Sequence, residues 1–517
     1  MKLRVFLLSL AALTGSVAAG ELPNIVIILA DDMGWGDPQC YQEDSKCPTP
    51  NLDRIAAEGM RFTDAHTPSS VCTPTRYTLL TGRYSWRTWL EKGVLDGFGP
   101  PLIGDDEDTL ATLLKRKGYR TACVGKWHLG MRWHDRKGEA VGVRGPQRFR
   151  PGDDIDFERD VTGGPNDVGF DSYFGISASL DMSPYCYLRD RRAEPLPTEW
   201  HDEIEGTMFL NGVSGVKSPG FDVHDVLPRF GDEAVAVIDS HAGREEPLFL
   251  YFPLNSPHLP VSPSNSAKGK SQAGDYGDFV WETDHVVGRV LDALDRAEMS
   301  ENTLVLFTSD NGGLWHWWEF RAADDGGKAP MTPRGQYVKD FGHQSNADWR
   351  GTKADIFEGG HRVPFLVRWP ARIAGGQVSD ALVELTDVFA TVSEIVEEPG
   401  TGTSGMDSFS FLSVLTEGEK KSRPFAVHHS LAGMFALRLG DWKMIEGRGS
   451  GGFTRPRNMA GEKGSPPGQL YDLGRDSRET TNRWADEPER IGRMFELLDQ
   501  IRRTSARDAA WGSPVVP

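Results

Sequence analysis

The chain has 517 residues, of which 38% are hydrophobic and 26% are charged, a balance that is typical of a folded protein and excludes wholesale disorder. Its formal net charge of −18 disfavours a nucleic-acid-binding protein, which would carry a basic excess. A chain of this length can form a large domain together with a smaller one. Because the chain is acidic, any site for an anionic ligand must be a local cationic pocket.

Residues 1–20 have the pattern of a secretory signal peptide. Lys2 and Arg4 precede an apolar run over residues 5–13, and small residues follow up to residue 20. We therefore expect an exported protein, periplasmic or extracellular. The apolar run is too short to span a bilayer and no later segment is long and apolar enough, so we expect no membrane span.

Five cysteines form an odd and sparse set, unlike a disulfide scaffold: Cys40, Cys47, Cys72, Cys123 and Cys186. Cys40 and Cys47 are close enough in sequence to form a disulfide, and the sequence leaves this question open.

Strand and helix patterns alternate along most of the chain. Continuous apolar runs predict buried strands over residues 23–30, 119–124, 247–252, 303–308 and 363–369. Helical patterns cover residues 52–59, residues 110–117 and the neighbourhood of residues 280–294. This alternation favours an α/β fold in which a mixed or parallel sheet is covered by helices on both faces. Polar clusters follow several strands, so we expect them to gather at one edge of the sheet.

The chain after the signal peptide divides into a predicted large domain, residues 21–405, and a small α+β domain, residues 406–517. Residues 397–405 (EEPGTGTSG) form the predicted boundary. The smaller domain contains predicted strands at 425–429 and 435–445, the second interrupted by a turn, and a charged helix at 487–503. Residues 131–167 and 319–348 have the composition of long loops.

Cys72 is a candidate nucleophile. It opens the sequence Cys-Thr-Pro-Thr-Arg, which ends at Arg76 and is followed by Leu-Leu-Thr-Gly-Arg at residues 79–83. A helix start and Arg76 would both favour negative charge at the cysteine. Taken alone, these facts fit an ordinary buried cysteine better.

Two acidic pairs follow predicted strands and form a candidate metal site. Asp31-Asp32 ends the first strand and Asp310-Asn311 ends the fourth. Carboxylate and amide oxygens are hard ligands that suit Ca²⁺ or Mg²⁺. Such pairs are also common in ordinary turns, but their place after buried strands favours a metal site.

Four cationic or titratable groups could form the required anion pocket. Lys126 and His128 lie in Gly-Lys-Trp-His-Leu-Gly, His258 ends Asn-Ser-Pro-His, and Lys353 ends Trp-Arg-Gly-Thr-Lys. Each of them alone is more often a solvated surface group.

Together these motifs resemble the signature of the type I sulfatases, which belong to the alkaline phosphatase superfamily. The resemblance extends from residue 24 to about residue 482, and Thr75 stands where the usual signature has serine. It implies a large mixed β-sheet sandwiched by helices, with a smaller C-terminal α+β domain. It also implies that Cys72 is oxidised to formylglycine by a separate maturation enzyme, and that one Ca²⁺ binds per chain. The metal ligands that it implies are Asp31, Asp32, Cys72, Asp310 and Asn311.

The resemblance further implies a role for each remaining residue. The hydrated aldehyde of residue 72 attacks sulfur while Asp310 takes its proton, and Lys126 and Lys353 hold the sulfate oxygens. Either His258 or Lys353 protonates the leaving alcohol. His128 then accepts the proton of the second hydroxyl of residue 72, which expels the sulfate. Arg76 holds the formylglycine in place.

We expect the substrate to be a sulfated small molecule or glycan, such as a sulfated polysaccharide. Four consecutive ring-bearing side chains that closely follow the Asp310-Asn311 pair either stack on such a substrate or pack in the core: Trp315, His316, Trp317 and Trp318. One alternative is a formylglycine-dependent phosphonate monoesterase or phosphodiesterase of the same superfamily. A more remote one is a non-catalytic carbohydrate-binding relative, which the presence of all ten matched positions disfavours.

Overall fold

The computed structural model describes residues 21–142, 144, 150–202, 212–314, 341–420, 422–459 and 465–512. The predicted signal peptide and the four ring-bearing residues at 315–318 lie outside these ranges. No helix within the described ranges is long and apolar enough to cross a bilayer.

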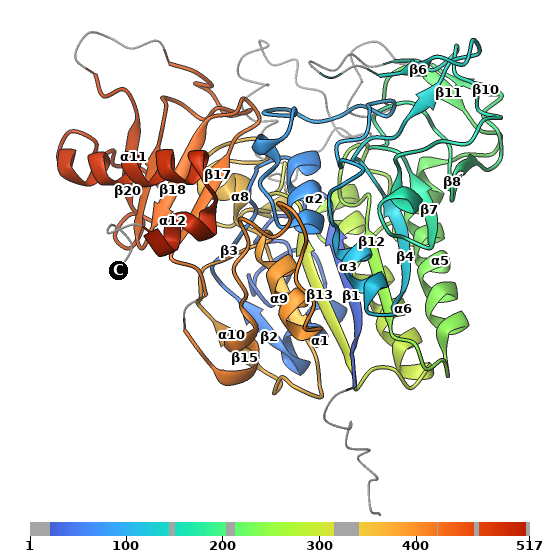
Figure 1. Ribbon diagram of the computed structural model, residues 1–517, viewed down its shortest axis with the longest axis horizontal. Helices are drawn as coiled ribbons and strands as arrows, with labels where there is room; N and C mark the ends of the chain where they lie inside the picture. The colour runs from blue at the N-terminus through green and yellow to red at the C-terminus, as the bar shows by residue number, and fades with distance from the viewer. Residues whose placement is uncertain are drawn as a thin grey trace, which may run out of the picture.

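A ten-stranded sheet forms the centre of the molecule (Figure 1). β1 (Asn24–Ala30) pairs in parallel with β12 (Leu248–Pro253) on one side and with β13 (Thr303–Ser309) on the other. β4 (Arg120–Lys126) and then β7 (Ser172–Ile176) extend the parallel part beyond β12. The carboxyl ends of these five strands therefore meet at one edge of the sheet.

Antiparallel pairs flank this parallel centre. β14 (Phe365–Arg368) is antiparallel to β13, and β2 (Met60–Phe62) is antiparallel to β14 and parallel to the edge strand β15 (Gln377–Ser379). At the other edge, β8 (Leu188–Arg189) and β9 (Arg192–Ala193) form antiparallel pairs. The sheet is therefore mixed, and every strand predicted between residues 23 and 369 is present, with ends shifted by at most two residues.

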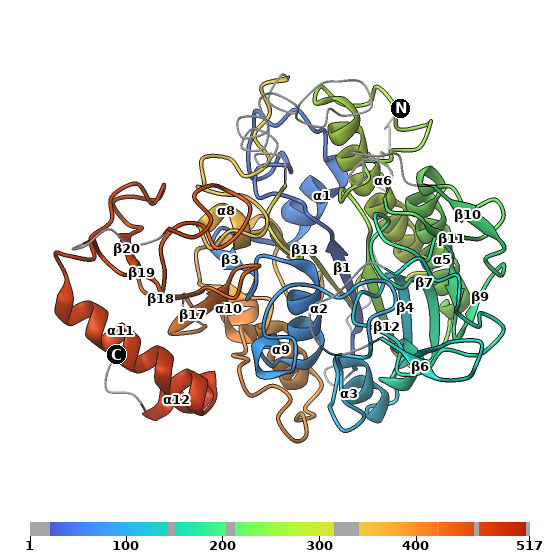
Figure 2. The same ribbon diagram turned by 90° about the horizontal axis from the view of Figure 1, so that it is seen from above.

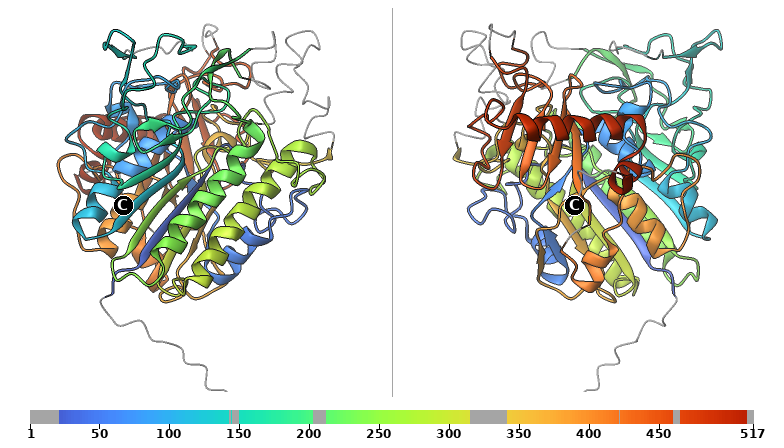
Figure 3. Two further views of the ribbon diagram at one scale, coloured as in Figure 1. Left: turned by 90° about the vertical axis from the view of Figure 1, so that its right-hand side faces the viewer. Right: turned by 60° about the vertical axis from the view of Figure 1, so that its left-hand side comes forward.

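Helices cover both faces of the sheet (Figure 3). Ile25, Ile27 and Leu29 of β1 join the core under one layer, whereas Val26 and Ile28 join the core under the other. This alternation explains why β1 is apolar at every position. The first layer contains α2 (Cys72–Thr81), α3 (Leu110–Arg116) and α9 (Asp387–Ile395), and the second contains α1 (Pro50–Glu58), α5 (Val226–His241) and α6 (Gly274–Arg296).

A second, antiparallel sheet lies at one side of the molecule (Figure 2). Its apolar core is shared with α11 (Pro488–Arg503) and α12 (Ala506–Gly512). The predicted strand at 435–445 divides at Gly440 and Asp441 as expected. The strands of this C-terminal sheet are β17 (Phe425–His429), β18 (Phe435–Leu439), β19 (Trp442–Ile445) and β20 (Gln469–Asp472).

The segment predicted as the domain boundary is bonded to the large domain. The amide of Gly405 donates to the Thr81 carbonyl oxygen at 2.8 Å, and Thr401 donates to Asp108. α10 (Leu412–Glu417) follows before the C-terminal sheet begins. The division at residues 405 and 406 stays a prediction.

The remaining short elements lie in connections, and three of them fall within the predicted loop at 131–167. They are β3 (Ala65–His66), η1 (Ser85–Arg87), β5 (Trp133–His134), β6 (Ala140–Val141), η2 (Pro165–Asp167), β10 (Glu199–His201), β11 (Gly215–Lys217), η3 (Val223–Asp225), α8 (Glu358–His361) and β16 (Val383–Glu384).

All five cysteines lie within the described ranges and all are free, so Cys40 and Cys47 do not form a disulfide in this structure. The Cys47 sulfur instead lies 3.6 Å from Nε2 of His343.

Gly125, next to Lys126 in β4, allows a close approach of two strands and gives a testable prediction. Its φ is +132°, and a Cβ at this position would lie 1.8 Å from the Pro253 carbonyl oxygen of β12. Because backbone strain and a backbone clash add, we expect Gly125→Ala to lower the free energy of unfolding by roughly 3 kcal/mol or more in urea denaturation.

Gly118→Ala is the matched control. Gly118 has a φ of +83°, but a Cβ there would meet nothing within 4 Å. We expect a loss of only about 1–2 kcal/mol, the strain of a left-handed residue alone. Equal losses in the two variants would contradict the role given to the β4–β12 contact.

Candidate active site

The carboxyl edge of the parallel strands brings the predicted site residues together. Cys72 is the first residue of α2, whose N-terminus faces the same site, and it is 2% exposed. The strand-end residues are also buried; they are Asp31 and Asp32 after β1, Lys126 at the end of β4, His258 after β12, and Asp310 and Asn311 after β13.

Three buried carboxylates are each paired with a buried cation. A carboxylate taken out of water without a partner would cost several kcal/mol, so these pairs make the burial possible. The pairs are Lys126 Nζ with Asp31 Oδ2 at 2.6 Å, Lys353 Nζ with Asp32 Oδ1 at 2.8 Å, and Arg76 Nη2 with Asp310 Oδ2 at 2.7 Å.

Asp32 is held in a strained backbone conformation. Its φ is +66°, a left-handed value that is uncommon for residues other than glycine. Its amide donates to Asp310 Oδ1 at 3.2 Å, and its Oδ1 accepts a hydrogen bond from Asn311 Nδ2 at 2.7 Å. His258 Nε2 lies 3.7 Å from Asp32 Oδ2. Strain of this kind persists where the surroundings hold it, often at functional sites.

Asp31 and Asp310 have opposite protonation tendencies. Burial, reinforced by the charge of Asp31, raises the pKa of Asp310 to about 7, although Arg76 acts against this rise. Burial also opposes ionisation of Asp31, but Lys126, His258 and the other nearby cations hold its pKa well below the usual range. Close carboxylates often divide in this way, because two negative charges in one site repel each other.

His128 is a neutral imidazole with one open lone pair. Its Nε2 lies 2.8 Å from the Leu95 carbonyl oxygen, which can only accept, so Nε2 carries the proton. Nδ1 is buried and has no hydrogen-bond partner within the described residues. Burial, together with the charges of Lys126 and Arg76, holds the pKa of His128 well below its ordinary range. The lowered pKa keeps the ring neutral at neutral pH, so the Nδ1 lone pair is available as an acceptor, and it also makes the ring a weaker base than a free histidine.

The residues fit a hard divalent cation. Asp31 Oδ1 and Asn311 Oδ1 are buried acceptors without a hydrogen-bond partner in the part of the chain that is described. Three potential ligand atoms lie within 4.8 Å of one another, one each from Asp31, Cys72 and Asp310. Orphaned buried oxygens are costly unless something binds them, and oxygens are the ligands that Ca²⁺ and Mg²⁺ take.

Cys72 is protonated in the unmodified protein. Burial raises the pKa of its thiol to about 11, although Lys126 and Lys353 act in the opposite direction. The thiolate is the reactive form of cysteine, so the unmodified side chain is a weak nucleophile in this environment.

Two further polar residues reach the same edge without having been predicted. Both side-chain atoms of Asn255 are buried without a hydrogen-bond partner among the described residues, and so is the Ser177 hydroxyl. Asn255 follows β12 and Ser177 follows β7. The backbone carbonyl oxygen of Ser177, not its hydroxyl, accepts the His128 amide at 3.0 Å. Their places directly after strands were the available signal, but asparagine and serine are too common in turns to stand out.

Comparisons with known proteins give consistent results. Residues 23–397 match the family model described as Sulfatase. An N-acetylgalactosamine-6-O-sulfatase of Bacteroides thetaiotaomicron is 31% identical over 514 residues, which cover 93% of this chain and 93% of that protein. An N-acetylgalactosamine-6-sulfatase of Canis lupus familiaris is 33% identical over 448 residues, which cover 85% of this chain and 74% of that protein.

Solved structures share the fold. One from work on glycosaminoglycan metabolism by Bacteroides thetaiotaomicron has a TM-score of 0.78 and 28% identity, and covers 93% of this chain and 100% of its own. The phosphonate monoester hydrolase of Agrobacterium radiobacter has a TM-score of 0.57 and 18% identity, with 93% of this chain and 96% of its own covered. The second likeness concerns the fold alone.

Proposed function

Because the chain belongs to the sulfatase family of sulfuric ester hydrolases, we propose that it removes sulfate from a sulfated glycan. The observation that carries this proposal is the set of three buried cations, Arg76, Lys126 and Lys353, beside Cys72 in a chain of net charge −18. A sulfate ester is an anion, and its negative charge must be met locally for it to bind such a protein.

The first substrate to test is N-acetylgalactosamine that carries a sulfate ester on O6. The names of the relatives from Bacteroides thetaiotaomicron and Canis lupus familiaris support this choice. The signal-peptide pattern of residues 1–20 supports export to the periplasm or the extracellular space.

We infer that Cys72 acts after oxidation to formylglycine by a maturation enzyme, and that one Ca²⁺ is held by Asp31, Asp32, Asp310, Asn311 and residue 72. Bound Ca²⁺ would supply positive charge that polarises the sulfate. The formylglycine would supply a hydroxyl nucleophile and, unlike a plain alcohol, a route by which sulfate can leave.

The remaining chemistry belongs to side chains that the chain already holds in place. Lys126 and Lys353 each have three donors, so each ammonium group can bind its carboxylate and a sulfate oxygen together. Asp310 accepts the proton of the attacking hydroxyl. Arg76 donates hydrogen bonds to Asp310 and to the Lys126 carbonyl oxygen and so keeps the Asp310 carboxylate oriented.

Two histidines complete the proton transfers. His258 lies near Asp32 and donates a proton to the leaving alcohol, a role for which Lys353 is the alternative. His128 accepts a proton from the second hydroxyl of residue 72, and loss of this proton releases the sulfate. The acceptor is its Nδ1 lone pair, which has no partner among the described residues.

The substrate assignment predicts a rate preference. With protein whose Cys72 has been matured, we expect kcat/KM for the 6-O-sulfate of N-acetylgalactosamine to exceed that for the 4-O-sulfate by roughly tenfold or more, which corresponds to about 1.4 kcal/mol of transition-state binding. Released sulfate is measured by ion chromatography. Faster hydrolysis of an aryl phosphodiester than of every sulfate ester would contradict the proposal and favour the phosphodiesterase alternative.

The nucleophile assignment predicts that Cys72→Ser loses multiple turnover by roughly a thousandfold or more, because a serine ester of sulfate has no easy exit. Peptide mass spectrometry should find sulfate retained on the serine hydroxyl, or no reaction. Cys186→Ser, which changes another buried cysteine, is the control and should keep kcat. Full multiple turnover by Cys72→Ser would rule out formylglycine.

The metal assignment predicts stabilisation by calcium. At a free Ca²⁺ concentration 100 times Kd, binding to the folded state alone adds about 2.7 kcal/mol, so Tm should rise after chelator-treated protein is reloaded. Asp31→Asn should weaken this response. Asp37→Asn, in the separate buried cluster of Asp37, Cys47 and His343, should retain it. The same Tm with and without Ca²⁺ would contradict the assignment.

A further inference from the structure

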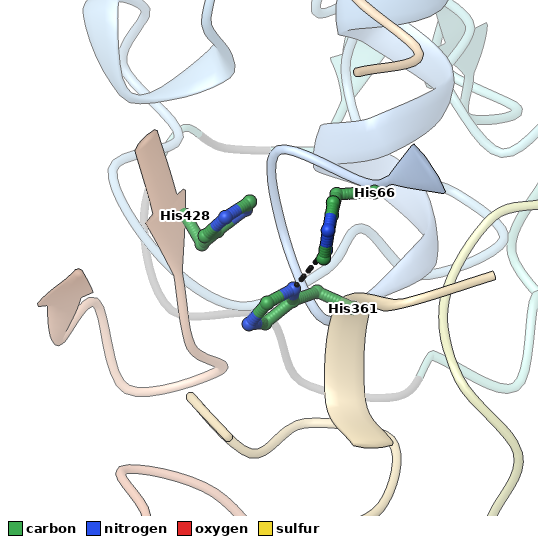
Figure 4. A group of neighbouring side chains, drawn as sticks. All are labelled: His66, His361 and His428. Atoms are coloured by element: carbon green, nitrogen blue, oxygen red, sulfur yellow. Dashed lines mark hydrogen bonds between the residues drawn. The ribbon is translucent and has the colours of Figure 1, made fainter. Parts of the chain in front are cut away.

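Three buried histidines meet between the large sheet and the C-terminal sheet (Figure 4). His66 ends β3, His361 ends α8, and His428 belongs to β17. One ring nitrogen of each lies within 4.8 Å of the others. None of them takes part in the chemistry described above, and their position between two catalytic segments calls for an explanation.

The stacking of two rings excludes a metal ion shared by all three. The His361 and His428 rings lie face to face, with centroids 3.9 Å apart and planes inclined by 9°. A metal ion binds a histidine about 2 Å from the nitrogen and in the plane of the ring. Two parallel planes in van der Waals contact have no such position in common.

Hydrogen bonds fix the tautomers of His66 and His361. The Lys443 ammonium group lies 2.9 Å from His361 Nε2 and can only donate, so His361 carries its proton on Nδ1. That proton bonds to His66 Nδ1 at 3.0 Å, and His66 Nε2 therefore donates to Asp64 at 2.8 Å. Arg438 Nη1 lies 3.2 Å from the same Nε2 and donates to Asp64 Oδ1 at 2.7 Å. Lys443 also pairs with Glu358 at 3.0 Å, so the chain of bonds runs from the C-terminal sheet into the large domain.

His428 contacts two polar groups among the described residues through Nδ1, the Thr67 carbonyl oxygen and, at 3.7 Å, Glu384 Oε1. Its Nδ1 donates to the Thr67 carbonyl oxygen at 3.0 Å, while its Nε2 is buried without a hydrogen-bond partner among the described residues. The ring therefore holds the Thr67 carbonyl from one side and the His361 ring from the other. Removal of its Nδ1–H would leave a buried carbonyl oxygen short of a donor.

The two segments that His428 joins lead directly to catalytic residues. Residues 66–70 precede Cys72, and residues 354–361 follow Lys353. They bond to each other, Ala354 N to Ser70 O at 2.7 Å and Thr67 N to His361 O at 2.7 Å.

The C-terminal sheet holds both segments through its backbone as well. Ser70 N donates to His429 O at 3.1 Å, and Leu431 N donates to Ala354 O at 3.0 Å. His428 is the side chain at the centre of this junction, one residue before the backbone bonds of His429.

We propose that His428 is a positioning residue for sulfate ester hydrolysis. It fixes the segment before Cys72 against the loop after Lys353. The C-terminal sheet thereby sets the distance between residue 72, the nucleophile, and the sulfate-binding ammonium group of Lys353. The inference rests on the proposed roles of Cys72 and Lys353. It requires that loss of the Nδ1–H donor lowers turnover in protein that is still folded and still binds substrate.

The test compares three variants by steady-state kinetics on an aryl sulfate and by amide hydrogen exchange. His428→Leu removes the donor, whereas His428→Asn keeps an N–H near the position of Nδ1. Leu498→Ala is a destabilising control, since Leu498 lies in α11 and the apolar cluster to which it belongs contains no residue of 66–70 or 354–361. All are assayed well below their own Tm.

We expect His428→Leu to lower kcat by roughly tenfold to a hundredfold, with KM changed by less than about threefold, because a displacement of the order of 1 Å costs up to about a hundredfold. His428→Asn should recover most of kcat. Amide exchange at residues 66–72 and 353–361 should accelerate in His428→Leu alone. Leu498→Ala should lower Tm by a few degrees and keep kcat.

Two results would overturn the proposal: wild-type kcat in His428→Leu, or an equal loss of kcat in Leu498→Ala. If the matured wild-type protein hydrolyses no sulfate ester, the proposed function itself is wrong. In that event unchanged exchange at residues 66–72 in His428→Leu would show that the ring does not hold this segment either.

Discussion

The structure depends on the mutual neutralisation of charges buried at the carboxyl edge of the central sheet. Asp31, Asp32 and Asp310 could not be buried there alone, and each has a cation from a different part of the chain within 3 Å. Removal of one partner from such a pair typically lowers the free energy of unfolding by about 3–5 kcal/mol, since the other charge stays buried. The fold therefore has to bring strand ends, the start of α2 and the Lys353 loop to one point.

That requirement explains how an acidic protein can bind an anion. The three cations are oriented by the carboxylates, and ammonium and guanidinium groups have donors to spare for a further oxygen. Long-range charge in the rest of the chain works against an anionic substrate, but it is screened beyond roughly 8 Å at physiological salt. Local geometry, not net charge, decides what the site binds.

Sequence patterns predicted the central sheet well because buried parallel strands are continuous apolar runs. β1, β4, β12 and β13 were found in this way, and the ends of β1 and β13 then indicated Asp31 and Asp310, whereas Lys126 and His258 came from motifs at strand ends. Cys72, Arg76 and Lys353 came from motifs, since no periodicity marks them. Short edge strands such as β8 and β9, two residues each, carry no pattern that could reveal them.

The contribution of the C-terminal sheet to the site could not be read from the sequence. His428 and Thr67 are 361 positions apart, and the bond between them depends on how two sheets pack, which local patterns do not encode. Asn255 and Ser177 were missed for a related reason: their lack of partners appears only when the structure is known. Buried polar atoms without partners therefore indicate site residues that the sequence patterns do not.

The proposed chemistry depends on residue 72 acting as formylglycine in sulfate ester hydrolysis. Peptide mass spectrometry across residue 72, made on the same preparation in which turnover of an aryl sulfate is measured with Ca²⁺ present, tests it most directly. We expect an aldehyde at residue 72 and an activity that rises in proportion to the modified fraction. Turnover at full rate by protein in which Cys72 is wholly unmodified would contradict it.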